Sequence, residues 1–531
     1  MKSRNPELDR FEQEYFDSMI KLSPLTASYL GLHEYDDFLD RVNEAHLRKA
    51  IALELDFLDK FMSFKESDLS HDQLITRKLF AYQTDLSRFR FDCIRRWESD
   101  ADAARFIGYA VFPLFTGQYA PLEQRIRSII KRLAQTGQLI KDFKNCLKRP
   151  VKLWLTMAQQ SISGTESFFE SMKAATSGNI SSKLWKEFDG ALTEALNELK
   201  NYSEYLDSLM PGASERFDIG DEAFRQLIKL RHMGLSVEEI KEIGNTSLKQ
   251  VTERMEHLAR KLGAGTIEEA RKLINGNNPG GFNSVLDFYR TAIDESREFV
   301  KSSGFAAIPL GGENIRVIET PQYMRHMIPF AAYIHPARFE DNPSGTYLVT
   351  PPKDEADLKK FNSFDIINTS IHEGFPGHHL QLASAITHPS PVRLITGSAI
   401  EFIEGWALYC EEQTFNMGFH NEQEREFVML NDILFRAARV IIDVELSSGR
   451  MTFNYAMKML SDNTGMGENE ARAEVNRYTE NPGYQLSYLI GKHQLLNLRK
   501  KWEKSPGFTL SMFHNTLLAN GSLPIFLHDE C

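Results

Sequence analysis

The sequence contains little cysteine. Four of its 531 residues are cysteines, and no two of them stand at the C-x-x-C spacing of a metal-binding pair. So low a content excludes a small disulfide-stabilised scaffold and favours reduced thiols. The N-terminus runs directly into a charged amphipathic pattern without an apolar signal segment. Together, these features predict a cytoplasmic protein.

Long apolar runs and an excess of positive charge are also lacking. No apolar stretch approaches the roughly 20 residues needed to cross a bilayer, so we expect no membrane span. The formal net charge of −11 argues against binding through phosphate neutralisation and predicts no nucleic-acid partner. The absence of a G-x-S-x-G motif argues against a serine hydrolase.

Apolar residues recur at helical spacing through most of the chain. Leu8, Phe11, Tyr15 and Met19 follow one another at steps of three or four and form one face of an amphipathic helix. Similar patterns occur at residues 53–64, 122–139, 192–209 and 251–262. Long helices joined by short polar loops predict a large, mainly α-helical fold.

Two kinds of segment interrupt this pattern. Residues 275–281 are rich in asparagine, glycine and proline. They suggest a division into an N-terminal helical region (1–275) and a metal-binding region (282–531), the two lobes of one continuous fold. Residues 315–318 and 347–349 are typical of short strands. We therefore expect a small β-sheet inserted into the helical fold.

Residues 371–379 concentrate side chains that bind metals, namely His372, His378 and His379 together with Glu373. In the common zinc-peptidase arrangement, two histidines stand at i and i+4 on one helix. Here the second histidine comes at i+6 or i+7. On a straight helix these positions lie about 240° around the axis or about 10 Å further along it. The segment can therefore bind one ion only if the helix is broken.

The residues between the histidines provide such a break. Pro376 would clash with the carbonyl four residues before it in a regular helix, and the glycines around it allow conformations that other residues avoid. We expect the helix to stop after Glu373 and to restart near Pro376. This detour favours His372 and His378 as ligands of one zinc ion, with His379 as the alternative to His378.

A second acidic cluster follows on a predicted helix over residues 398–412. A catalytic zinc usually takes three protein ligands, so the third must come from another element. Glu404 and Glu411 are seven residues apart and nearly in phase, and Glu401 lies one turn earlier. Buried acidic side chains need partners, which zinc and its histidines would provide. We predict Glu404 as the third ligand, Glu411 as the residue that orients a ligand histidine, and Glu401 as a further support.

These motifs resemble the DUF885 family. Residues 372–381 and 404–411 carry the likeness most specifically, and residues 24–33 and 482–488 extend it over nearly the whole chain. The resemblance implies a gluzincin-like zinc peptidase with a helical fold and a central cleft. It also implies a second histidine ligand that follows a glycine, which suits His378. In gluzincin peptidases the third ligand is a glutamate with another glutamate seven residues later, and this resemblance suits Glu404 and Glu411.

The chemistry expected from these residues is hydrolysis of a peptide-like amide, with one zinc ion per chain. Zinc would activate water and polarise the scissile carbonyl, while Glu373 would carry a proton from the water to the leaving amine. Tyr488, with Tyr484 second, is the candidate donor to the oxyanion.

Further residues are candidates for binding a peptide substrate. Arg436, Arg439 and Arg477 could hold a carboxylate through their guanidinium groups. Tyr347 could lie on an edge strand that pairs with an extended peptide. Two alternatives stay open, a metal-dependent esterase or amidohydrolase and a non-catalytic helical binding protein with a residual metal site.

Overall fold

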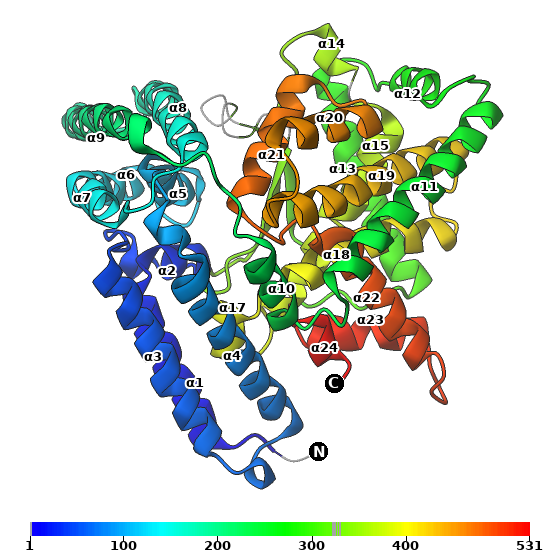
Figure 1. The fold of residues 1–531 in the computed structure, drawn as a ribbon, viewed down its shortest axis with the longest axis horizontal. Coiled ribbons are helices and arrows are strands. Elements are labelled where there is room, and N and C mark those ends of the chain that lie inside the picture. Colours follow the sequence, from blue (N-terminus) through cyan, green and yellow to red (C-terminus); the bar gives the residue numbers. More distant parts are fainter. Residues whose placement is uncertain (1–2, 321–324, 326–327, 329–330, 360) are drawn as a thin grey trace.

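A computed structural model describes residues 3–320, 325, 328, 331–359 and 361–531 (Figure 1). Helices and one three-stranded sheet form the described part, which confirms the predicted mainly α-helical fold with a small inserted sheet. The N-terminal helices lie to one side of a larger body (blue to teal in Figure 1). They are α1 (Pro6–Leu22), α2 (Pro24–Leu30), α3 (Glu44–Ser63), α4 (His71–Phe89), α5 (Ala103–Thr116), α6 (Leu122–Leu133), α7 (Thr136–Cys146), α8 (Lys152–Thr176) and α9 (Ser182–Leu209).

The first two helices show how the apolar spacing and the turn formers determine these elements. Asn5 caps α1 because its side chain accepts hydrogen bonds from backbone N–H groups of the first turn. Leu8 and Tyr15 are buried on the predicted apolar face. Pro24 starts α2, and Gly31 ends it with a φ of 89°, a conformation that favours glycine. The predicted amphipathic helix is therefore confirmed.

Three helices connect the N-terminal group to the rest of the chain, namely α10 (Asp221–Leu230), α11 (Val237–Lys261) and α12 (Ile267–Asn275). α10 contacts both α4 and α19 (Gln423–Ser447), and α11 packs along α19. One hydrophobic core joins Phe224 and Met255 of these helices to Leu408 and Leu434. The turn-rich residues 275–281 separate α12 from α13 (Phe282–Ser303), but helices on both sides of this turn pack into the same body.

The inserted sheet consists of β1 (Ile315–Glu319), β2 (Ala331–Ile334) and β3 (Gly345–Val349) in the order β1-β3-β2. Its two predicted strands are confirmed. β3 runs parallel to β1 and antiparallel to β2, so that Tyr347 lies between Val317 and Tyr333. The prediction that Tyr347 lies on an edge strand is therefore wrong, because the backbone of β3 is paired on both sides. Its ring is buried against Tyr289 of α13, with the centroids 5.4 Å apart.

The remaining helices form most of the larger body. They are α14 (Glu355–Leu358), α15 (Ser363–Glu373), α16 (His378–Ala385), α17 (Pro391–Thr396), α18 (Ile400–Asn416), α19, α20 (Phe453–Thr464), α21 (Glu468–Glu480), α22 (Ser487–Trp502), α23 (Leu510–Ala519) and α24 (Ile525–His528). α18 contacts α15, α16 and α22. It crosses α22 closely at Gly405 and Gly491, where a Cβ on Gly491 would lie 2.1 Å from the carbonyl oxygen of Glu401. This crossing holds α18 beside the break between α15 and α16.

Candidate metal centre

The two candidate histidines lie on either side of a break between α15 and α16. α15 ends at Glu373, which confirms the predicted end of the helix, whereas α16 begins at His378, two residues later than the predicted restart at Pro376. The backbone N–H of Gly377 bonds to the carbonyl of Ile371 at 3.0 Å. The restart is later because this bond folds the connection back onto the last turn of α15.

A side chain at position 377 should disrupt this connection. A Cβ on Gly377 would lie 1.9 Å from the carbonyl oxygen of His372, so the backbone itself would have to move. We expect Gly377→Ala to reduce the free energy of unfolding by about 3 kcal/mol or more and to abolish metal binding. Denaturant unfolding and metal analysis measure the two effects. Gly164→Ala in α8 is the control, because a Cβ there meets no atom within 4 Å; equal stability of the two variants would contradict the close contact.

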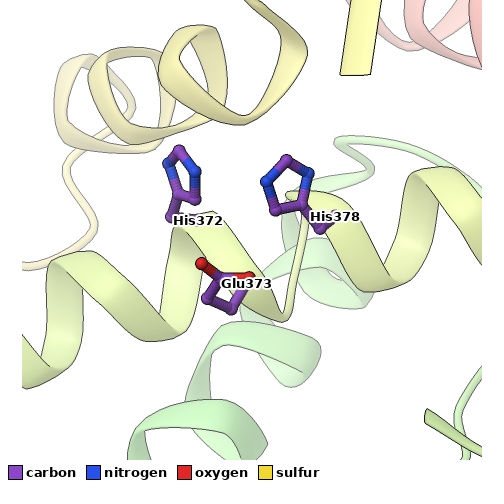
Figure 2. A group of neighbouring side chains, drawn as sticks. All are labelled: His372, Glu373 and His378. Carbon is purple, nitrogen blue, oxygen red and sulfur yellow. The ribbon is translucent and has the colours of Figure 1, made fainter. Parts of the chain in front are cut away.

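His372, Glu373 and His378 converge on one space. One ligand atom from each residue lies within 4.8 Å of the other two. The two imidazole centroids are 4.7 Å apart, and the rings are nearly perpendicular. Figure 2 shows the three side chains at the break between the helices. The interruption therefore brings together two histidines whose spacing would separate them on a regular helix.

Glu404 of α18 completes this group. Its Oε2 lies 3.8 Å from Nε2 of His372 and 3.4 Å from Nε2 of His378. All three residues are buried, with exposed fractions of 7 to 9 %. Two imidazole nitrogens and a carboxylate oxygen thus face one another. This donor set fits zinc, which binds histidine and glutamate and takes three protein ligands in its catalytic sites.

The charges around His372 favour a cation. Burial lowers the pKa of this imidazole, but hydrogen bonds to Glu404 and Glu411 outweigh burial and raise the pKa to about 10. For Glu404 the two effects are reversed. Burial raises the pKa of its carboxyl group, but the neighbouring His372 and His378 hold this pKa well below its usual range. Carboxylates that stabilise an imidazolium will also stabilise a metal ion, which can replace the imidazole proton.

Metal binding should release a proton and strengthen with pH. A ligand imidazole must be neutral, whereas the metal-free His372 is protonated at pH 7 because its pKa is about 10. Its proton is lost more easily as the pH rises, so we expect the zinc affinity to increase about tenfold per pH unit between about pH 7 and 9. Competition with a chelator at each pH measures this slope, and a pH-independent affinity would contradict the raised pKa.

Glu411 holds His372 in its orientation. Nδ1 of His372 bonds to Oε1 of Glu411 at 2.6 Å, which leaves Nε2 to face the ion. Asn368 donates to the other oxygen of Glu411 at 3.0 Å and to Asp432 at 2.9 Å, and Arg436 pairs with Asp432 at 2.9 Å. Burial raises the pKa of Glu411, but its bond to His372 lowers it overall. The contacts agree with the orienting role predicted for Glu411.

His379 is held away from this group. Its Nδ1 bonds to the hydroxyl of Tyr333 at 2.8 Å and its Nε2 to the carbonyl of Gly312 at 3.0 Å. Burial lowers its pKa to about 4, so the ring is neutral at pH 7. Both nitrogens are occupied, and the structure therefore brings His378 rather than His379 to Glu404.

Two other predicted residues have different partners. Glu401 accepts a hydrogen bond from Nε of Arg231 at 2.6 Å and supports no ligand histidine. Arg477 is exposed and pairs with Glu474 at 2.6 Å. The prediction for Glu401 as a support of the metal ligands is therefore wrong. The prediction that Arg477 holds a substrate carboxylate is also wrong, because its exposed guanidinium pairs with Glu474. Helical phase alone did not show which charged neighbour each side chain would meet.

The predicted oxyanion donors lie beside the carboxylate ligand. The hydroxyl of Tyr484 donates to Oε1 of Glu404 at 3.1 Å, the oxygen opposite the one that faces the histidines. Tyr488 lines one cavity together with the two histidines and Glu404. Burial raises the pKa of Tyr488, so its phenol stays protonated and can donate. Asp443 accepts bonds of 2.8 and 2.7 Å from two backbone N–H groups of the loop that carries Tyr484.

One cavity of about 230 Å³ is lined by the two histidines, by Glu373, Glu404 and Glu411, and by Tyr488. Asp365, Asn368, Thr369 and Asp432 also line it, and the sequence analysis did not identify them. The sequence did indicate three of them by helical spacing. Residues 365, 368 and 369 precede His372 by seven, four and three positions and therefore share its helix face. Asp432 lies on α19, and no spacing in the sequence relates it to α15.

Two solved structures resemble the chain over nearly its whole length. One is from Shewanella oneidensis and is provisionally described as a lipoprotein of unknown function; it has a TM-score of 0.79 and 22% identity over 98% of each chain. The other, from Colwellia psychrerythraea and also provisionally described as a lipoprotein, has a TM-score of 0.83 and 20% identity over 98% of this chain and 97% of that one. At these identities the likeness shows the fold alone.

No curated protein matches the chain. Within the described residues, every helix is too short or too polar to cross a bilayer. The cytoplasmic location expected from the sequence stays a prediction.

A family model matches residues 24–528 and therefore nearly the whole chain. The match includes the break between α15 and α16, all of α18 and the loop before α22, which together carry the candidate metal centre. The chain belongs to the family described as bacterial proteins of unknown function, DUF885.

Proposed function

We propose that this protein is a zinc-dependent hydrolase of peptide or peptide-like amide bonds. The observation that carries the proposal is the convergence of Nε2 of His372, Nε2 of His378 and Oε2 of Glu404, with Glu373 beside the two histidines. Three ligands and an adjacent carboxylate in one polar cavity are typical of catalytic zinc sites.

Zinc held by His372, His378 and Glu404 would supply a Lewis acid and acidify a water molecule. Glu373 lies on the cavity wall within 4.8 Å of ligand atoms of both histidines. From this position its carboxylate would take a proton from the attacking water and deliver it to the leaving nitrogen. The water oxygen bonds to the acyl carbon and the amide C–N bond breaks. The acyl part leaves as a carboxylate, and both protons of the water end on the amine, which leaves as an ammonium group.

Two tyrosines would stabilise the negative charge that develops on the carbonyl oxygen. Tyr488 faces the cavity as a protonated phenol, and Tyr484 already donates to Glu404. Tyr488 is the better candidate because the hydroxyl of Tyr484 has this carboxylate as its partner. A donor placed in advance on a rigid helix stabilises the oxyanion without reorganisation during the reaction.

The experiment that tests the proposal combines elemental analysis with a substrate screen. We expect the purified protein, reconstituted with zinc, to hold about one ion per chain. The zinc-loaded protein should cleave members of a peptide library, with matched esters and acylated amino acids as comparison substrates. Zinc bound without turnover of any substrate would favour a binding protein, and turnover of esters alone would favour an esterase. Either result would overturn the proposal.

A further inference from the structure

Arg439 projects a buried positive charge into the wall of the candidate active-site cavity. It lies on α19, is 3 % exposed, and lines the cavity together with His372, His378 and Glu404. A buried guanidinium normally has an acidic partner, because an uncompensated charge in the interior is strongly unfavourable.

Within the described part of the chain, no acidic side chain pairs with Arg439. Its Nε donates to Oε1 of Gln485 at 2.9 Å, and its Nη2 donates to the same amide oxygen. The partner is neutral, and Nη1 has no hydrogen bond to a described residue. The rings of Tyr488, Phe435 and Tyr478 lie 4.3, 4.9 and 5.5 Å from the guanidinium carbon. Glu404 and Glu474 stabilise the charge from a distance, without a direct ion pair.

Two neighbouring buried arginines have a carboxylate partner. Arg231 pairs with Glu401 at 2.6 Å, and Arg436 pairs with Asp432 at 2.9 Å. Arg425 also lacks a carboxylate partner, but its two terminal nitrogens bond to backbone carbonyls and a threonine, and it does not line the cavity. Arg439 is thus the cavity arginine that has a neutral hydrogen-bond partner in place of a carboxylate, whereas Arg436 has Asp432.

We propose that Arg439 binds a carboxylate of the substrate, so that the site acts on peptides whose free carboxyl terminus lies close to the scissile bond. This inference rests on the proposed function and deepens it, because it assigns a carboxypeptidase or dipeptidase rather than an endopeptidase. The guanidinium matches a carboxylate in shape and charge, and Gln485 and Tyr488 hold it in place from two sides. Hydrolysis releases the C-terminal residue with its original carboxylate and a new amino group.

The test compares two substrates that differ only at the carboxyl terminus, acetyl-trialanine and acetyl-trialanine amide. We expect the zinc-loaded protein to cleave the free acid with a kcat/KM about 100-fold or more above that of the amide. Arg439→Gln should reduce this ratio to below about threefold, and Arg439→Lys should restore part of it. Arg477→Gln is the control, because Arg477 is an exposed arginine outside the cavity. Circular dichroism verifies that each variant folds.

Calorimetric titration with the same two peptides decides the inference even if neither is cleaved. We expect the wild-type protein to bind the acid about 100-fold more tightly than the amide, and Arg439→Gln to bind both alike. Equal binding of acid and amide by the wild-type protein would overturn the carboxylate site. Hydrolysis of both peptides at equal rates would also overturn it while leaving the proposed hydrolase intact, whereas selective binding without hydrolysis would refute the hydrolase alone.

Discussion

Glu373→Gln should abolish peptide hydrolysis and leave the metal bound. Glutamine has nearly the same shape as glutamate but cannot accept the proton of the attacking water. A positioned general base contributes about 10²- to 10⁴-fold, so we expect kcat/KM to fall by about 10³-fold. Zinc content should not change, because His372, His378 and Glu404 provide the ligands in this proposal. Steady-state kinetics and elemental analysis on the same preparation measure both quantities.

The matched control is Glu256→Gln, which makes the same chemical change at an exposed position of α11. It should leave both activity and zinc content as in the wild type. If Glu373→Gln retained activity within about tenfold of the wild type, Glu373 would not be the general base. If it instead lost zinc together with activity, Glu373 would be a ligand, and the roles of Glu373 and Glu404 would need to be exchanged.

The local features of the site were predictable because they depend on residues close in the sequence. The spacing of His372 and His378, together with the proline and glycines between them, required an interrupted helix, and the helix ends at Glu373 as expected. Glu411 could be placed by helical phase relative to Glu404, and its 2.6 Å contact with His372 agrees with that phase. Short-range geometry thus determined which side chains turn toward one another.

The errors concern partners that are distant in the sequence. Glu401 has the right helical phase for the site, but Arg231 lies 170 residues away and forms the pair with it. No periodicity within α18 could have revealed that arginine. The crossing of α18 and α22 at Gly405 and Gly491 was also unpredictable, because its two glycines are distant in the sequence. Each glycine by itself indicates only a possible close approach.

The strand that contains Tyr347 is different, because its sequence did hold the missing information. All five residues of β3 are buried. A run without polar alternation is typical of a strand that is covered on both faces and paired on both sides, rather than of an edge strand. In the sequence, residues 347–349 form an unbroken apolar run, which favours the central position that the structure shows over an edge.

Glu404→Ala should remove zinc from the protein. The change deletes the carboxylate oxygen that lies 3.8 and 3.4 Å from the two histidine nitrogens. It also removes one of the two carboxylates whose hydrogen bonds raise the pKa of His372. Loss of a residue that only supports a ligand lowers metal affinity about 10- to 100-fold, so loss of the ligand itself should exceed about 100-fold. Competition with a chelator measures the affinity.

Glu401→Gln separates loss of a ligand from damage to α18, because Glu401 lies one turn before Glu404 on the same helix. This variant breaks the buried pair with Arg231, and we expect it to lower the free energy of unfolding by about 3 to 5 kcal/mol. Its folded fraction should nevertheless bind zinc with wild-type affinity. If Glu401→Gln lost zinc as completely as Glu404→Ala, the integrity of the helix would account for both results. Loss of zinc from Glu404→Ala alone would instead identify its carboxylate as the ligand.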